Sequence, residues 1–110
     1  MQMSKFYIIG TYSDQALSGF IKNPNDDRSA VIGGMVSSMG GNLFLFDIVR
    51  GHADFIAGFD GIDFEKLASM KIAVQSTGMI KEFTVLETLD MNKVAAGANE
   101  ALSGYRKPGE

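Results

Sequence analysis

The 110-residue sequence contains no cysteine and only one histidine, His52. Without cysteine, the chain has no disulfide bonds, no thiolate nucleophile and no cysteine-based metal site. A single histidine excludes a multi-histidine zinc or iron centre within one chain, although a symmetric oligomer could bring several copies together. We therefore expect neither a metal site nor a cofactor.

Clusters of basic residues and long apolar segments are also absent. The 10 Lys and Arg residues are scattered among 13 Asp and Glu residues, and the net charge is -3. This pattern does not favour binding to nucleic acid or to an anionic membrane. No segment approaches the roughly 18 apolar residues of a membrane span, and "MQMSKFYIIG" lacks the apolar length of a signal peptide. We expect a soluble, cytoplasmic protein without nucleic-acid or membrane partners.

The apolar residues that are present follow strand and helix periods. Strands are predicted at residues 5–12, 42–49, 54–59 and 79–89. One helix is predicted from an N-cap at Asn23, with Pro24 as its first residue, to Gly40-Gly41. Others start from N-caps at Asp63 and Asp90, and the segment 13–22 predicts only a short helical turn, interrupted at Gly19.

This order of elements is β-α-β-β-α-β followed by a C-terminal helix. It is the order of the ferredoxin-like fold, an α+β architecture with a four-stranded antiparallel sheet. At 110 residues the chain has room for one hydrophobic core. We predict a single domain over residues 1–110, with a core of about 5–90 and a C-terminal helix at 90–105.

The second strand predicts self-association because both of its faces are apolar. Strict alternation places Phe44, Phe46 and Ile48 on one face and Leu43, Leu45, Asp47 and Val49 on the other. Helices of one chain cover only one face of such a sheet, and the C-terminal helix could cover part of the second. A second copy is the better cover, since exposed apolar faces of this size are rare in monomers. We expect a homodimer with two facing sheets, or a higher homo-oligomer.

From about residue 5 to residue 90 the sequence resembles the GYD domain family, within the dimeric α/β-barrel group. The shared features are the first strand ending in Tyr12, Arg28 near the start of the long helix, the Gly40-Gly41 pair, "RGHADFI" and "STGMIKEFTVLETL". "RGHADFI" stands where the family has its Gly-x-Tyr-Asp turn. Gly51 and Asp54 match that turn, whereas Ala53 replaces its tyrosine. The resemblance implies the fold but no particular activity, because related barrels include cofactor-free monooxygenases, isomerases, haem enzymes and amino-acid sensors.

His52 is the obvious candidate for proton transfer, since the unperturbed pKa of histidine lies near neutrality. Its neighbours favour a simpler interpretation. Gly51 supplies the positive φ that a tight hairpin requires, and the Asp54 side chain can accept hydrogen bonds from N–H groups of the turn. We interpret this segment first as a hairpin turn and keep catalysis by His52 as the alternative.

Asp47 interrupts an apolar strand, and an unpaired buried carboxylate would be costly. It is therefore exposed near the strand end, paired with Arg28 or Arg50, or part of a polar pocket, and we favour the pairing. Tyr7 and Tyr12 on the first strand could line a pocket for an aromatic ligand, or simply pack as amphipathic aromatics.

Three functional hypotheses follow. The first is an oligomeric protein that binds a small apolar or aromatic ligand between sheet and helices, through Tyr7, Tyr12, Arg28, Asp47, His52 and Asp54. The second is a cofactor-independent monooxygenase or isomerase with His52 or Asp47 as base, which an apolar pocket containing either side chain would favour. The third is a purely structural oligomer subunit.

Overall fold

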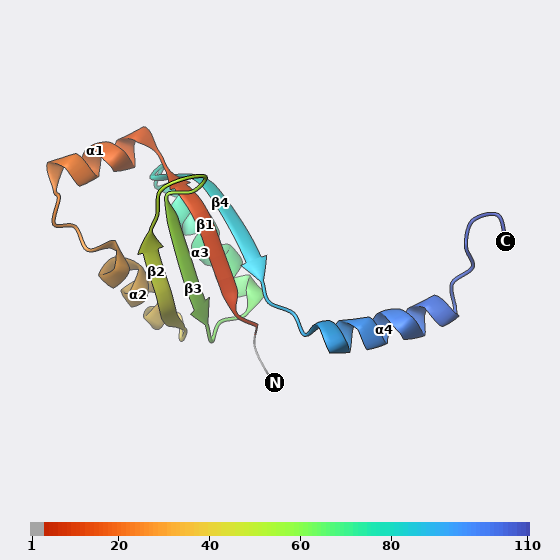
Figure 1. The fold of residues 1–110 in the computed structure, drawn as a ribbon. Helices are drawn as coiled ribbons and strands as arrows, with labels where there is room; N and C mark the ends of the chain where they lie inside the picture. Colours follow the sequence, from red (N-terminus) through yellow and green to blue (C-terminus); the bar gives the residue numbers. More distant parts are fainter. Residues whose placement is uncertain (1–3) are drawn as a thin grey trace.

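The computed structural model describes residues 4–110, which form one antiparallel sheet flanked by helices (Figure 1). The strands are β1 (Phe6–Tyr12), β2 (Asn42–Ile48), β3 (Phe55–Asp60) and β4 (Ile80–Glu87). The helices are α1 (Asp14–Lys22), α2 (Arg28–Ser38), α3 (Phe64–Ser76) and α4 (Met91–Ser103). The strand order is β2-β3-β1-β4. This confirms the predicted ferredoxin-like α+β fold with a C-terminal helix.

The core lies between one face of the sheet and the helices α2 and α3. Phe6 and Ile8 of β1 and Phe59 of β3 point to this face, and each is at most 2 % exposed. Val36 of α2 and Leu67 of α3 close the core from the helix side. Each such side chain contributes about 1.5–3 kcal/mol by leaving water, so this layer is the main source of stability.

The first helical region differs from the prediction. Segment 13–22 is a full helix, α1, which starts at the N-cap Ser13 and continues through Gly19. Asn23 is the C-cap of α1 and not the N-cap of α2, whose N-cap is Asp27. The prediction was wrong here because Asn23 and Asp27 are both good capping residues and the sequence alone does not rank them.

The faces of β2 also differ from strict alternation. The register between β2 and β3 shifts between Leu43 and Leu45, which is a β-bulge. Leu43 and Phe46 therefore both pack against the core, while Phe44 lies on the other face. The predicted grouping of Phe44 with Phe46 was wrong for this reason.

The other element ends follow the sequence signals. Asp63 and Asp90 are N-caps, and their carboxylates accept hydrogen bonds from the backbone N–H groups of Lys66 and Lys93. Gly51, in the loop between β2 and β3, has a φ of 138°, as predicted. That loop is longer than the predicted hairpin turn. It runs from residue 49 to 54, where the Val49 N–H donates to the carbonyl of Asp54 (2.8 Å).

The second face of the sheet carries no helix from the part of the chain that is described (Figure 1). The C-terminal helix, which was considered as a possible partial cover, does not lie on this face. Helix α4 projects away from the sheet, all its residues are exposed, and the molecule is 63 Å long. Its radius of gyration is 18.2 Å, against about 13 Å for a compact chain of this length.

No helix within residues 4–110 combines the length and the apolar character needed to cross a membrane.

Candidate functional site: an apolar cavity between sheet and helices

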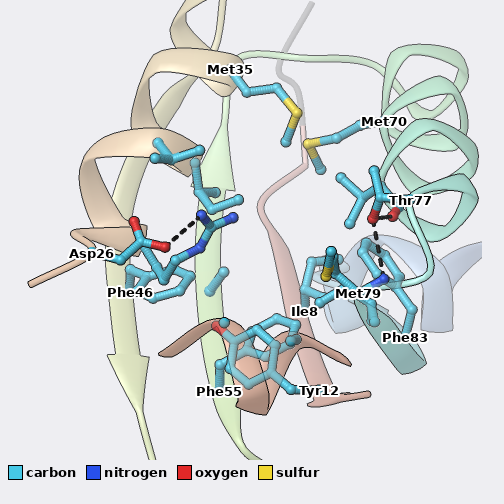
Figure 2. A pocket seen from close by; sticks show the side chains of 18 of the residues that line it. Ile8, Tyr12, Asp26, Met35, Phe46, Phe55, Met70, Thr77, Met79 and Phe83 are labelled. Atoms are coloured by element: carbon cyan, nitrogen blue, oxygen red, sulfur yellow. Dashed lines mark hydrogen bonds and ion pairs between the residues drawn. The ribbon is translucent and has the colours of Figure 1, made fainter. Parts of the chain in front are cut away.

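A cavity of about 500 Å³ lies between the core face of the sheet and the helices α1, α2 and α3. Met35 of α2 and Met70 of α3 stand at one end of it, while Tyr12 and Phe55 stand at the other (Figure 2). Helix α1, which follows β1 after Ser13 alone, contributes Gln15, Ala16, Gly19 and Phe20 to the lining of the cavity. Its walls are almost entirely apolar.

An aromatic cluster forms the wall at the Tyr12 end. The ring centroid of Tyr12 lies 5.1 Å from that of Phe55 and 5.0 Å from that of Phe20, the latter edge-on. Phe46 stacks on Phe55 with a centroid distance of 6.1 Å. These rings present flat faces and edges, which pack well against another planar molecule.

Gly10 makes this arrangement possible. Gly10 of β1 pairs with Phe55 of β3, and a Cβ at Gly10 would lie only 2.5 Å from the Phe55 ring and 2.7 Å from the Glu82 carbonyl oxygen. The absent side chain therefore lets the Phe55 ring lie over the central strand, where it becomes part of the cavity wall.

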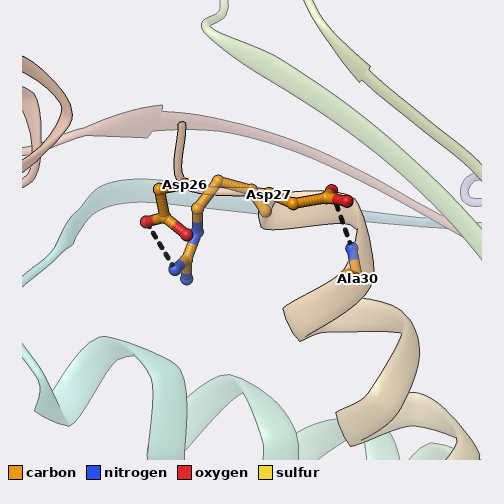
Figure 3. Close-up of polar contacts among 4 residues, drawn as sticks. Asp26, Asp27 and Ala30 are labelled. Carbon is orange, nitrogen blue, oxygen red and sulfur yellow. Dashed lines mark hydrogen bonds and ion pairs between the residues drawn. The ribbon is translucent and has the colours of Figure 1, made fainter. Parts of the chain in front are cut away.

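The charged groups of the cavity come from the start of α2. The Arg28 guanidinium donates to the Asp26 carboxylate (Nη1 to Oδ2, 3.2 Å), and both side chains are about one third exposed at 32 %. Asp27 accepts from the Ala30 N–H and fixes the helix start, so that the next residue points to the cavity (Figure 3). Arg28 and Asp26 compensate each other's charge, and an exposed pair of this kind adds little stability.

The phenol of Tyr12, which lines the cavity, has a shifted pKa. Burial raises the pKa of its phenol above 10.0, the nearby Asp54 and Asp26 carboxylates raise it further, and Arg28 lowers it in part. The phenol therefore keeps its proton at neutral pH and can donate a hydrogen bond. The backbone N–H of Tyr12 donates to Asp54 (2.9 Å), which fixes the end of β1 beside the cavity.

A second, more polar hollow of about 490 Å³ adjoins the apolar cavity and shares Tyr12, Phe20, Asp26, Arg28 and Phe46 with it. Its charged residues are the carboxylates of Asp26, Asp27, Asp47 and Asp54 and the guanidinium of Arg28. Within residues 4–110 these acids do not form a group that could hold a metal ion. The apolar cavity is thus adjoined by a solvent-open hollow that is lined mainly by acidic side chains.

The structure brings together only part of the predicted site. Tyr12 and Arg28 line the apolar cavity, and Asp47 and Asp54 line the adjoining hollow. Tyr7 lies on the opposite face of the sheet, where its ring meets Phe44 edge-on at 5.7 Å. His52 is exposed in the loop between β2 and β3 and lines neither hollow.

Two of the acids have different surroundings from those predicted. Asp54 accepts from the Tyr12 N–H of the neighbouring strand and not from its own turn. Asp47 is exposed near the end of β2 and lines the polar hollow, which are the first and the third of the three explanations considered. The favoured pairing of Asp47 with Arg28 or Arg50 was wrong, since the ion pair found among residues 4–110 joins Arg28 to Asp26.

Sequence reasoning missed the contribution of α1 and of the methionines. Ala16 and Phe20 of α1 line the cavity, as do Met35, Met70 and Met79. A signal for α1 was present, because Ser13 followed by Asp14 is a typical helix start. The methionines gave no signal, since methionine at helical spacing also fills ordinary cores.

The comparison with known proteins identifies the family. No curated protein and no solved structure matches the sequence at a significant level. The GYD domain matches residues 6–97, from the start of β1 into the middle of α4. The chain therefore belongs to the GYD domain family.

Proposed function

We propose that the protein binds a small apolar or aromatic molecule in the cavity between its sheet and α1–α3. The observation that carries this proposal is the cavity itself, about 500 Å³ with apolar walls in a chain of 110 residues. Ligand sites are typically 300–1,000 Å³, mostly apolar, with a few polar groups that fix orientation.

The walls favour a largely uncharged, partly planar ligand. Phe46, Phe55 and Tyr12 offer ring faces at one end, and the flexible side chains of Met35 and Met70 adapt to the outline of a ligand at the other. The phenol of Tyr12 donates to a single polar group on the ligand. Arg28 supports this role because its guanidinium carries donors beyond the one directed at Asp26.

The geometry favours binding over catalysis. The residues around the apolar cavity do not include His52 or Asp47, the two candidate bases. His52 is exposed, and Asp47 borders the solvent-open hollow. A base must come within about 2.6–3.2 Å of the proton that it removes. Neither residue lines the cavity, so binding without catalysis is the function that we propose.

The uncovered sheet face supports a second proposal, self-association. Tyr7 and Ile9 of β1, Ile56 of β3 and Leu86 of β4 share this face by strand register, and Phe44 of β2 joins them through the bulge. Apolar side chains thus lie on all four strands of a face without a helix (Figure 1). We infer that a second copy of the chain covers this face, which makes the protein a homodimer or a larger homo-oligomer.

A cavity-filling substitution tests ligand binding. The probe is 1-anilinonaphthalene-8-sulfonate, whose fluorescence reports transfer into an apolar site. Ala16 of α1 lines the cavity, so Ala16→Trp should fill it and raise the Kd of the probe at least tenfold. Ser18→Trp is the matched control, because Ser18 lies on the same helix but is exposed and lines neither hollow.

Wild type and Ser18→Trp should bind one probe per chain with the same Kd. The proposal is contradicted if the wild type does not bind the probe saturably, or if Ala16→Trp binds it as well as Ser18→Trp does.

A further inference from the structure

Helix α4 is a regular helix but packs against no other element of residues 4–110. Asp90 caps its first turn by accepting from the Lys93 N–H (3.2 Å), and all of its residues are exposed. Apart from Ala96, its apolar residues repeat at helical spacing and fall in one stripe: Met91, Val94, Ala95, Ala98, Ala101 and Leu102. Tyr105 extends the stripe just beyond the helix and is 59 % exposed.

Such a helix needs a partner to persist. An isolated helix shorter than about 12–15 residues is marginal in water, and most helices gain their stability from packing an apolar face. Gly97, in the middle of α4, has no atom near it that would explain its presence and lowers helix propensity further. We therefore expect the apolar stripe of α4 to be buried against another protein surface in the functional protein.

The charge of α4 favours a protein partner over a membrane surface. Its charged residues are Lys93 and Glu100, both away from the stripe, so its polar face is neutral. Helices that lie on membranes typically carry a polar face rich in Lys and Arg. The polar face of α4 has none of this excess.

We propose that α4 is an exchanged arm, whose stripe packs on the uncovered sheet face of a second copy of this chain. The proposal rests on the self-association inferred above and adds to it the element that completes the interface. Within residues 4–110 of one chain, two apolar surfaces have no partner, the sheet face and the α4 stripe. A symmetric pair of copies covers both, because each copy gives one helix and receives another.

The connection to β4 supports this placement. The Thr88 N–H and the Lys5 carbonyl extend the β4–β1 pairing by one hydrogen bond of 3.0 Å, so that only Leu89 and Asp90 separate the sheet from α4. Because β4 is an edge strand, α4 leaves the sheet at its border, where a facing copy would lie. Leu89 is itself 61 % exposed and continues the apolar surface from the sheet to the stripe.

The sheet face is large enough to receive the arm. Four strands span about 19 Å and a seven-residue strand about 23 Å, which gives a sheet face of about 440 Å² in flat projection. Helix α4, with 13 residues, is about 20 Å long and 10 Å wide, and offers about 200 Å². One arm therefore fits on the sheet face of the second copy and covers about half of it.

Charge substitutions on the two faces of α4 test the arm. Val94→Asp/Leu102→Asp places two carboxylates in the stripe, and Asn92→Asp/Asn99→Asp places the same charges on the polar face as the matched control. The stripe variant should raise the dimer Kd about a hundredfold, since each substitution removes a buried aliphatic side chain. Analytical ultracentrifugation measures the Kd, and circular dichroism checks that each variant is folded. If the dimer Kd of the stripe variant equals that of the wild type, the proposal that α4 is an exchanged arm is wrong.

A third variant distinguishes the contribution of α4 to dimerisation from that of the sheet face. Leu86→Asp alters the sheet face, and Ile72→Asp on the outer side of α3 is its control, since both side chains are exposed aliphatics. If Leu86→Asp weakens the dimer and the α4 stripe variant does not, self-association through the sheet face stands and the exchange of α4 is wrong. If the wild type stays monomeric at the highest measurable concentration, both self-association and the exchange of α4 are wrong.

Photo-crosslinking locates the arm. The chain has no cysteine, so Ala98→Cys provides a unique thiol in the stripe for a benzophenone maleimide. In a mixture of ¹⁴N- and ¹⁵N-labelled protein, crosslinks between the two isotopic forms should join residue 98 to outward-facing residues of β1, β3 or β4. Crosslinks only within one chain, or only to α1–α3 of the second copy, overturn the proposal.

Discussion

Replacing Gly10 with alanine tests the geometry on which the cavity depends. Gly10 lies in the central strand β1 and faces the cavity side of the sheet, opposite Phe55 in the register. The new Cβ would lie 2.5 Å and 2.7 Å from two carbons of the Phe55 ring and 2.7 Å from the Glu82 carbonyl oxygen. The ring can rotate away, but the carbonyl belongs to the neighbouring strand and cannot move without disturbing the sheet.

The cost follows from two opposing effects. Overpacking of a core site costs about 1–3 kcal/mol, while replacing glycine with alanine restricts the unfolded chain and returns about 0.4–1 kcal/mol. We expect Gly10→Ala to lower the free energy of unfolding by about 1–2 kcal/mol. The variant should also weaken binding of the anilinonaphthalene probe, because the displaced Phe55 ring enters the cavity.

A double-mutant cycle with Phe55→Leu identifies the cause. Removing the ring relieves its share of the clash, so the double variant should be more stable than the sum of the single effects by about 1 kcal/mol. The remaining loss reports the contact with the Glu82 carbonyl. Urea unfolding, followed by far-UV circular dichroism at one fixed protein concentration, measures all four proteins. Strictly additive effects, or a Gly10→Ala variant as stable as the wild type, would refute the position of the Phe55 ring.

Three further predictions concern single positions. Gly34→Ala should raise the free energy of unfolding by about 1 kcal/mol, because Gly34 is inside α2 with open space where the Cβ would go; a loss of stability in urea would contradict this. Asp63→Ala should lower it by about 1 kcal/mol by removing the cap on the Lys66 N–H of α3 (2.8 Å), and an unchanged urea midpoint would argue against the cap. The raised pKa of Tyr12 means that the folded protein keeps the phenol proton longer than the unfolded chain, so this contribution to stability is complete below the ordinary value of 10.0 and is lost as the pH rises above it. Tyr12→Phe should therefore show a smaller decline of the urea midpoint between about pH 9 and pH 11 than the wild type, and equal declines would show that burial does not perturb the phenol.

The sequence was sufficient for the fold but not for the position of every element. Alternation in residues 5–12 and the caps at Asp63 and Asp90 are local signals, and the structure agrees with them. The β-bulge in β2 depends on the pairing with β3, which no local pattern encodes. The direction of α4 was equally beyond prediction, since its stripe fits any apolar surface.

In the candidate site, too, some features follow from local sequence signals and others depend on tertiary packing. Tyr12 and Arg28 were predicted and line the cavity, because strand parity and helix position place them there. Tyr7 was predicted with Tyr12, but the odd spacing between them along a regularly alternating strand puts Tyr7 on the opposite face. The cavity is lined by residues of several helices and strands, and their relative placement follows from tertiary packing.

Native mass spectrometry of protein purified from its source tests the central claim most directly. The claim is that the cavity holds a small apolar or aromatic molecule. Gentle ionisation should show the folded protein with one retained small molecule per chain, and Ala16→Trp produced in the same host should lose that mass. A spectrum of bare chains from the wild type, or the same retained mass in Ala16→Trp, would contradict the account.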